Sequence, residues 1–142
     1  MGPAANVAEA FVALAEVLWW AVSLDEGYQA RDGPSYIRRR DSDPDGELWH
    51  GVRFARNRAG HQRLVMVRRR RGAELGSLVL GVSRLGTVTE LVWRPANELP
   101  TDPRHPDHEG RRVYEQVLQG RPVRETIEAL HRWFNKAAGR SA

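Results

Sequence analysis

The N-terminal part of the chain carries a clear helical pattern of apolar residues. From Asn6 onward they recur at steps of three and four, at Val7, Phe11, Leu14, Leu18 and Val22. Because this spacing stacks side chains on one face of an α-helix, it predicts a first helix whose apolar face enters the core. Trp19 and Trp20 are adjacent and cannot share one narrow stripe. We expect one to enter the core and the other to meet a neighbouring element or a second subunit, with core packing favoured for both.

The segment 25–47 lacks this periodicity and is rich in glycine, proline and aspartate. Such a composition predicts a long loop over 25–47, with a short extended piece at 35–39. The helical pattern then resumes within a narrow arc of a helical wheel, at Leu48, Val52, Ala55 and Ala59. A second helix is therefore predicted from about Glu47 to at least Gln62.

The region after the second helix fits more than one structure. Residues 63–71, with the sequence RLVMVRRRR, suit either an extension of the helix or a strand. Residues 77–95 carry β-branched side chains on both sides of Leu85 and Gly86, which is typical of a β-hairpin. We therefore predict a small β insertion over 72–95, followed by a proline-rich loop.

Two further helices are predicted near the C-terminus. The first runs from near Glu109 to Gln119 and is stopped by Gly120, and the second begins at Pro122, a favourable first-turn residue. The residues expected to face inward are Val113, Tyr114, Val117, Leu118, Val123, Ile127, Leu130 and Phe134. The pattern thus predicts a mainly α fold, a helical bundle of about four helices with a small β-hairpin insertion. If 63–71 is a strand, the alternative is an α+β fold.

The length and composition limit the class of protein. With 142 residues, 41% of them hydrophobic, the chain suits one domain, 1–142, with a single core. The absence of cysteine excludes disulfides, thiolate metal sites and a cysteine nucleophile. The apolar N-terminal stretch contains Glu9 and Glu16 and lacks a basic leader, which argues against a signal peptide or a membrane span. We expect a cytoplasmic protein that does not contact a membrane.

The positive charge of the chain is clustered. The net charge of +4 favours polyanionic partners, and two arginine runs stand out from the rest. The candidate nucleic-acid-binding residues are Arg38, Arg39, Arg40, Arg68, Arg69, Arg70 and Arg71. Aromatic residues near them that would be available for base stacking are Tyr36, Trp49 and Trp93. Both runs also fit ordinary solvated surfaces.

One motif on the second predicted helix points to chemistry. Arg56, Asn57 and His61 stand in the order R-N-x-x-x-H. When the apolar stripe of this helix faces the core, Asn57 and His61 lie on the outward side, with Phe54 exposed nearby and Arg56 on the flank. Histidine titrates near neutral pH and arginine is well shaped to bind phosphate, so the motif is a candidate catalytic site.

This motif on a helix of a small, mainly helical domain resembles the signature of HEPN-domain proteins, which are metal-independent ribonucleases. The resemblance implies a dimer of helical bundles that cuts RNA at a composite cleft, often under the control of an antitoxin protein. It would make His61 a general acid or base, Arg56 the group that stabilises the phosphorane, and Asn57 the residue that orients the histidine or the phosphate. No metal or other cofactor would be needed.

Other interpretations remain open. The motif residues also fit the polar face of an amphipathic helix, and the arginine runs also fit a non-catalytic nucleic-acid-binding module. A third possibility is an accessory protein that forms a homodimer through Phe54, Trp19 or Trp20. A metal site at Asp102, His105, Asp107 and His108 is disfavoured, because these residues are typical of an exposed loop.

Overall fold

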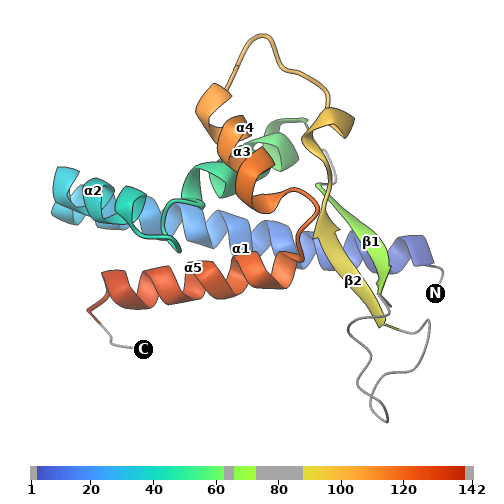
Figure 1. The fold of residues 1–142 in the computed structure, drawn as a ribbon, viewed down its shortest axis with the longest axis horizontal. Helices are drawn as coiled ribbons and strands as arrows, with labels where there is room; N and C mark the ends of the chain where they lie inside the picture. The colour runs from blue at the N-terminus through green and yellow to red at the C-terminus, as the bar shows by residue number, and fades with distance from the viewer. Residues whose placement is uncertain (1–2, 63–65, 73–87, 140–142) are drawn as a thin grey trace.

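The computed structural model describes residues 3–62, 66–72 and 88–139. Its helices are α1 (Pro3–Asp32), α2 (Pro34–Ser42), α3 (Trp49–Gln62), α4 (His108–Val113) and α5 (Val123–Ala137), and its strands are β1 (Val67–Gly72) and β2 (Val88–Trp93). A 3₁₀ turn, η1 (Ala96–Glu98), precedes α4, and a π-helical turn, η2 (Tyr114–Leu118), follows it. Figure 1 shows a mainly α fold with a β-hairpin, as predicted.

The expected loop over 25–47 is wrong for most of its length. α1 continues through this region to Asp32, and α2 follows almost at once. Gly33, with a φ of 58°, makes the break between the two helices, and Pro34 occupies the first turn of α2. The extended piece expected at 35–39 is therefore helical. Glycine and proline mark the helix boundaries here, and polar residues continue through the helices themselves.

A buried ion pair explains why this polar segment is helical. Asp25 of α1 and Arg40 of α2 have relative exposures of 1% and 4%, and Nη1 of Arg40 lies 2.9 Å from Oδ1 of Asp25. The hydroxyl of Tyr36 donates to the same carboxylate oxygen over 2.8 Å and accepts from Nε1 of Trp133 on α5 over 3.1 Å. Burial raises the pKa of Tyr36 above its ordinary value. These bonds connect α1, α2 and α5.

The hairpin pairs β1 with β2 in antiparallel register, from Val67 opposite Trp93 to Gly72 opposite Val88. The segment 67–72 is thus a strand, so one strand of the predicted insertion begins earlier than 72. Residues 73–87, including the turn expected at Leu85 and Gly86, lie outside the described residues. β2 also contacts the segment before α5, where the backbone N–H of Trp93 donates to the carbonyl of Arg121 over 3.1 Å.

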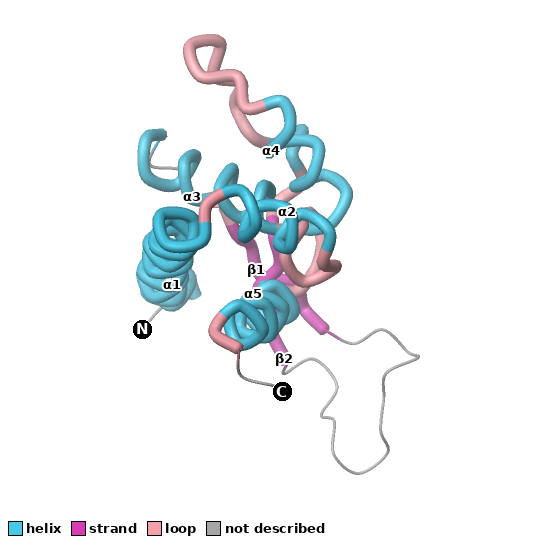
Figure 2. Tube along the Cα trace, turned by 90° about the vertical axis from the view of Figure 1, so that its left-hand side faces the viewer, coloured by secondary structure: helices cyan, strands magenta, loops and turns pink. Residues whose placement is uncertain are grey.

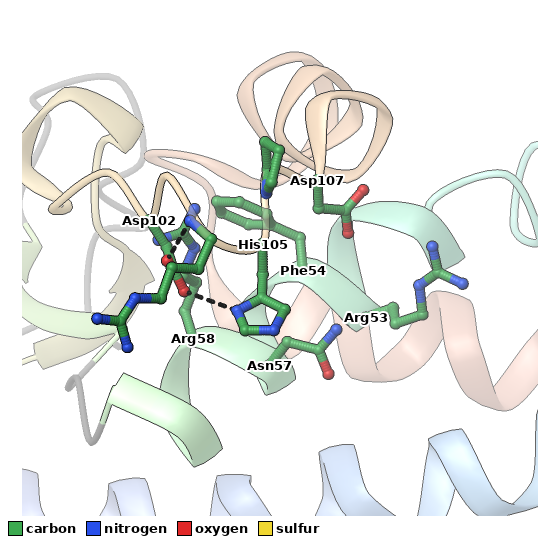
Figure 3. Close-up of a pocket in the computed structure, with 9 residues that line it drawn as sticks. Arg53, Phe54, Asn57, Arg58, Asp102, His105 and Asp107 are labelled. Carbon is green, nitrogen blue, oxygen red and sulfur yellow. Dashed lines mark hydrogen bonds and ion pairs between the residues drawn. The ribbon is translucent and has the colours of Figure 1, made fainter.

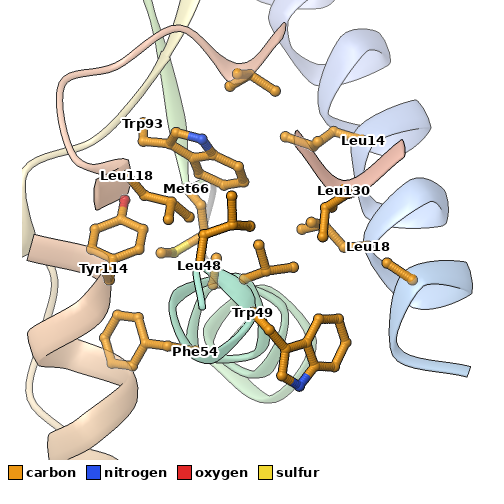
Figure 4. Close-up of a cluster of buried hydrophobic side chains, with 14 of the residues drawn as sticks. Leu14, Leu18, Leu48, Trp49, Phe54, Met66, Trp93, Tyr114, Leu118 and Leu130 are labelled. Atoms are coloured by element: carbon orange, nitrogen blue, oxygen red, sulfur yellow. The ribbon is translucent and has the colours of Figure 1, made fainter. Parts of the chain in front are cut away.

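α3 lies at the centre of the core, between α1 on one side and the α4–η2 segment on the other. Leu48, Val52 and Ala55 are buried, as the apolar stripe predicted. Phe54 was expected to be exposed but has only 1% relative exposure, and its ring centroid lies 5.3 Å from that of Tyr114 (Figure 4). The α4–η2 segment covers this second face of α3, so Phe54 belongs to the core.

The C-terminal helices follow the predicted order, but not every residue that was predicted to face the core does so. Gly120 ends η2 with a φ of 71°, and Pro122 precedes α5. Ile127 was predicted to be inside but is 37% exposed. The buried face of α5 is centred elsewhere because Nε1 of Trp93 donates to Oγ1 of Thr126 over 2.8 Å, which turns Thr126 into the core.

The two tryptophans of α1 do not enter the core. Trp19 and Trp20 are 59% and 68% exposed, so the expectation of core packing is wrong for both. Figure 2 shows the reason, because α1 lies at one edge of the molecule. Its buried residues face the remaining helices, and the adjacent tryptophans fall outside that arc.

Candidate functional site

The motif residues occupy the C-terminal half of α3, and the structure brings two of them into direct contact. Arg56 and Asn57 are both half-buried, and Nη1 of Arg56 donates to Oδ1 of Asn57 over 2.9 Å. His61 follows Asn57 by one helical turn, which places its backbone on the same side of α3. The side chain of His61 lies outside the described part of the structure.

Arg56 also contacts α1. Its guanidinium carbon lies 4.8 Å from the ring centroid of Trp19, and the two side chains line a groove of about 280 Å³ between α1 and α3. Nε of Arg56 is buried and has no hydrogen-bond partner in the described structure. The side chain of Arg56 thus lies on the side of α3 that faces α1, while its Nη1 contacts Asn57.

Asn57 faces a larger cleft on the other side. This cleft, of about 720 Å³, separates α3 from the proline-rich loop before α4 (Figure 3). Its lining consists of Arg53, Phe54, Asn57, Arg58, Asp102, Arg104, His105, Pro106 and Asp107. Three arginines face two aspartates, so the lining has a net positive charge before histidine is counted.

The loop brings a histidine and a carboxylate to this cleft. Nδ1 of His105 lies 3.4 Å from Oδ2 of Asp102, and the imidazole lies beside Asn57 in the cleft (Figure 3). The other oxygen of Asp102 accepts from the backbone N–H of Arg104 over 3.0 Å, which fixes the carboxylate in the turn. The His105 side chain is 85% exposed, so a bound molecule would have access to its ring.

Arg58 holds the loop against α3. Although charged, it has a relative exposure of only 7%, and its Nη1 donates to the carbonyl of Pro100 over 3.0 Å. Its guanidinium also lies over the ring of Phe54, at 5.0 Å from the centroid. Arg53 and Arg104 are exposed instead, and within the described structure neither side chain has a carboxylate partner. These two are the arginines available to an anion.

The arginine runs do not form one cationic surface. The run at 38–40 lies on α2 and the run at 68–71 on β1, toward opposite ends of the molecule (Figure 1). Four of the seven side chains pair with carboxylates: Arg39 with Asp32, Arg40 with Asp25, Arg68 with Glu98, and Arg70 with Glu90. Arg38 is exposed and Arg69 half-buried, and the side chain of Arg71 lies outside the described part.

The aromatic residues expected to stack on bases are not accessible. Tyr36, Trp49 and Trp93 have relative exposures of 0%, 2% and 0%, so that expectation is wrong. His50, the other histidine of α3, lies 3.2 Å from Oδ1 of Asp41 and does not line the cleft. The sequence suggests only a disfavoured metal site for Asp102 and His105, and the signal for their pairing is the D-x-x-H spacing beside two prolines.

The described residues contain neither a candidate metal site nor a candidate membrane span. Among them, no group of three or more histidine, aspartate or glutamate side chains is arranged to hold a metal ion. None of their helices is both long enough and apolar enough to cross a membrane. No protein-family model, curated protein or solved structure matches the chain.

Proposed function

We propose that this protein is an endoribonuclease that cleaves RNA without a metal ion, in the cleft between α3 and the loop 102–107. One observation carries the proposal: the imidazole of His105, paired with Asp102, faces Asn57 in a cleft that Arg53 and Arg104 also line. A polyanion with its own nucleophile is a suitable substrate for such a site. Both the HEPN-like motif and the net charge of +4 agree with this substrate class.

The proposed reaction uses the ribose 2′-hydroxyl as the nucleophile. His105 accepts the proton of the 2′-hydroxyl while the oxygen attacks the adjacent phosphorus, and the bond from phosphorus to the 5′-oxygen breaks. The leaving 5′-oxygen takes a proton from a second carrier, for which we propose His61, so the products are a 2′,3′-cyclic phosphate and a 5′-hydroxyl. Because the nucleophile is already held beside its phosphate, positioned side chains are enough for catalysis.

The remaining residues have supporting roles in this proposal. Arg53 and Arg104 attract the phosphodiester backbone and stabilise the charge that develops on the phosphate oxygens. Asn57 hydrogen-bonds the phosphate or the ribose, and Arg56 holds the amide of Asn57 in place through its 2.9 Å hydrogen bond. The family resemblance also implies an antitoxin partner, and the proposal places the protein in the cytoplasm, where RNA is available.

The decisive experiment is cleavage of a mixed RNA pool in the presence of EDTA. We expect the wild type to leave 2′,3′-cyclic phosphate ends, and His105→Ala, His61→Ala and Arg56→Ala to reduce the rate strongly. His131→Ala is the matched control, since His131 is an exposed histidine on α5, away from the cleft. Full activity in His105→Ala would contradict the proposed mechanism, and intact RNA with folded wild type would contradict the enzymatic function.

A second possible function is RNA binding without cleavage, which the two available arginines of the cleft also support. It is distinguished by measuring RNA affinity at several salt concentrations. Removal of Arg53 or Arg104 should lower the slope of log affinity against log salt by about 0.7 per phosphate contact on a single strand. Arg124→Ala is the control, because Arg124 is 75% exposed on α5. Binding with these slopes and no cleavage would identify a binding module.

A further inference from the structure

The outward face of α1 carries a continuous seam of exposed positions. These are spaced alternately by four and three residues, at Ala13, Val17, Trp20, Leu24, Gly27 and Arg31. Val17, Trp20 and Leu24 are 38%, 68% and 47% exposed, although each is large and apolar. An average spacing of 3.5 residues is the one that keeps side chains along a helix pair in contact.

This seam plays no part in the core of the described structure. The buried apolar residues of α1 are Leu14, Leu18, Ala21 and Val22, and Phe11 packs partly against the same cluster. Figure 2 shows the other helices on the inward side of α1, which leaves the opposite side at the edge of the molecule. A row of exposed large apolar residues along one helix is typical of a surface that another protein covers.

We propose that a second copy of this chain packs against the seam, with the two α1 helices antiparallel. The register that sets Trp20 against Leu24 of the other copy also sets Val17 against Gly27 and Ala13 against Arg31. Each layer then joins a large side chain to a smaller one, which lets the two surfaces interdigitate. The seam from Ala13 to Arg31 is about 27 Å long at 1.5 Å per residue, or five helical turns.

Charge complementarity selects the antiparallel orientation. In this register Arg31 of one copy lies opposite Ala13 of the other, between Glu9 and Glu16, which are both exposed. The Arg31 side chain is 61% exposed and is held in place by Asp32 at 2.8 Å and by the ring of Tyr28 at 4.9 Å. In a parallel pair, Arg31 of one copy would instead lie opposite Arg31 of the other copy, and the two positive charges would repel each other. The two-fold arrangement is also self-complementary, as a symmetric dimer requires.

The oligomeric state is the first test. By sedimentation equilibrium we expect the wild type to have twice the monomer mass of 16.1 kDa, and Trp20→Glu to halve that mass while keeping the wild-type circular dichroism spectrum. Ile127→Glu is the matched control and should remain dimeric, because Ile127 is an exposed apolar residue on α5, outside the seam. A monomeric wild type, or a Trp20→Glu variant that stays dimeric, would overturn the proposal.

Disulfide trapping tests the register and remains informative if Trp20→Glu fails to fold. The chain has no cysteine, so single-cysteine variants report one contact at a time. Under mild oxidation, a mixture of Val17→Cys and Gly27→Cys should form mixed disulfide dimers, whereas Val17→Cys alone should form few. The reverse result would overturn the antiparallel register. This inference does not depend on RNA cleavage. If the protein cleaved RNA as a monomer, the proposed dimer would be contradicted and the proposed function would stand.

Discussion

The guanidinium of Arg56 lies over the indole ring of Trp19, at 4.8 Å from its centroid, and so connects the motif helix α3 to α1. The contact holds the side chain of Trp19 in a defined position, although this side chain is 59% exposed. Arg56 also donates to Asn57, which lines the cleft between α3 and the loop 102–107. Trp19 does not line this cleft, and it is connected to Asn57 through Arg56.

This cation–π contact should appear as a coupling between the two residues. We expect a double-mutant cycle of Trp19→Ala and Arg56→Ala to give an interaction free energy of about 0.5–1 kcal/mol, as is usual for a partly exposed pair. The measurement is urea unfolding of the four proteins at one protein concentration. Strictly additive effects on the free energy of unfolding would show that the contact is not energetically significant.

The buried ion pair between Asp25 and Arg40 should be the most sensitive polar contact in the described structure. Asp25→Ala leaves the buried guanidinium of Arg40 with one carboxylate partner in the described structure, the more exposed Asp41 at 2.9 Å, so we expect it to lower the free energy of unfolding by about 3 kcal/mol. Asp32→Ala, which breaks only exposed pairs with Arg31 and Arg39, should have little effect. Chemical denaturation checks both. Equal effects of the two substitutions would mean that burial does not decide the strength of the pair.

Two glycines of α3 should respond in opposite directions to alanine. A Cβ atom at Gly51 would lie 3.0 Å from Cδ1 of Leu118 and 3.1 Å from the backbone of Tyr114, so Gly51→Ala should destabilise by about 1–3 kcal/mol. At Gly60 a Cβ would meet nothing within 4 Å, so Gly60→Ala should stabilise by about 0.5–1 kcal/mol through helix propensity. Thermal unfolding measures both. A Gly51→Ala variant with the same thermal stability as the wild type would contradict the close approach of α3 to η2.

Asp45 should make stability depend on acid pH. The hydrogen bond from Arg132, with a contribution from Lys136, lowers the pKa of Asp45 below its ordinary value of 3.8. Since the pKa is lower in the folded state, the stabilisation is complete above pH 3.8 and is lost as the pH falls through the folded-state pKa. Asp45→Asn should therefore be less stable than wild type near neutral pH, and the difference should shrink in strong acid. Unfolding curves across this range provide the measurement, and a constant difference would contradict the assignment.

The spacing of apolar residues predicts burial correctly where a single face of a helix packs against the core. The stripe of Leu48, Val52 and Ala55 is buried as predicted, and Gly120 and Pro122 mark the expected boundary between C-terminal helices. These features depend on residues within a few turns of one another. Their spacing and their backbone preferences act without help from distant parts of the chain.

The sequence failed where a helix has a second covered face or a distant polar partner. Phe54 lies outside the apolar stripe, and only the α4–η2 segment, some 60 residues later, shows that this side is covered. The helical course of 25–42 likewise depends on Asp25 finding Arg40 and Tyr36 across two helices.

The motif and the cleft show the same division. Sequence alone determined that Arg56, Asn57 and His61 share one helix, because helical spacing is a local property. The tertiary structure alone decided that Arg56 contacts Trp19 and that Asn57 faces His105, a residue of a loop 48 positions further along the chain. Contacts of that range arise only when the core has brought α1, α3 and the loop together, and no periodicity within a single segment encodes them.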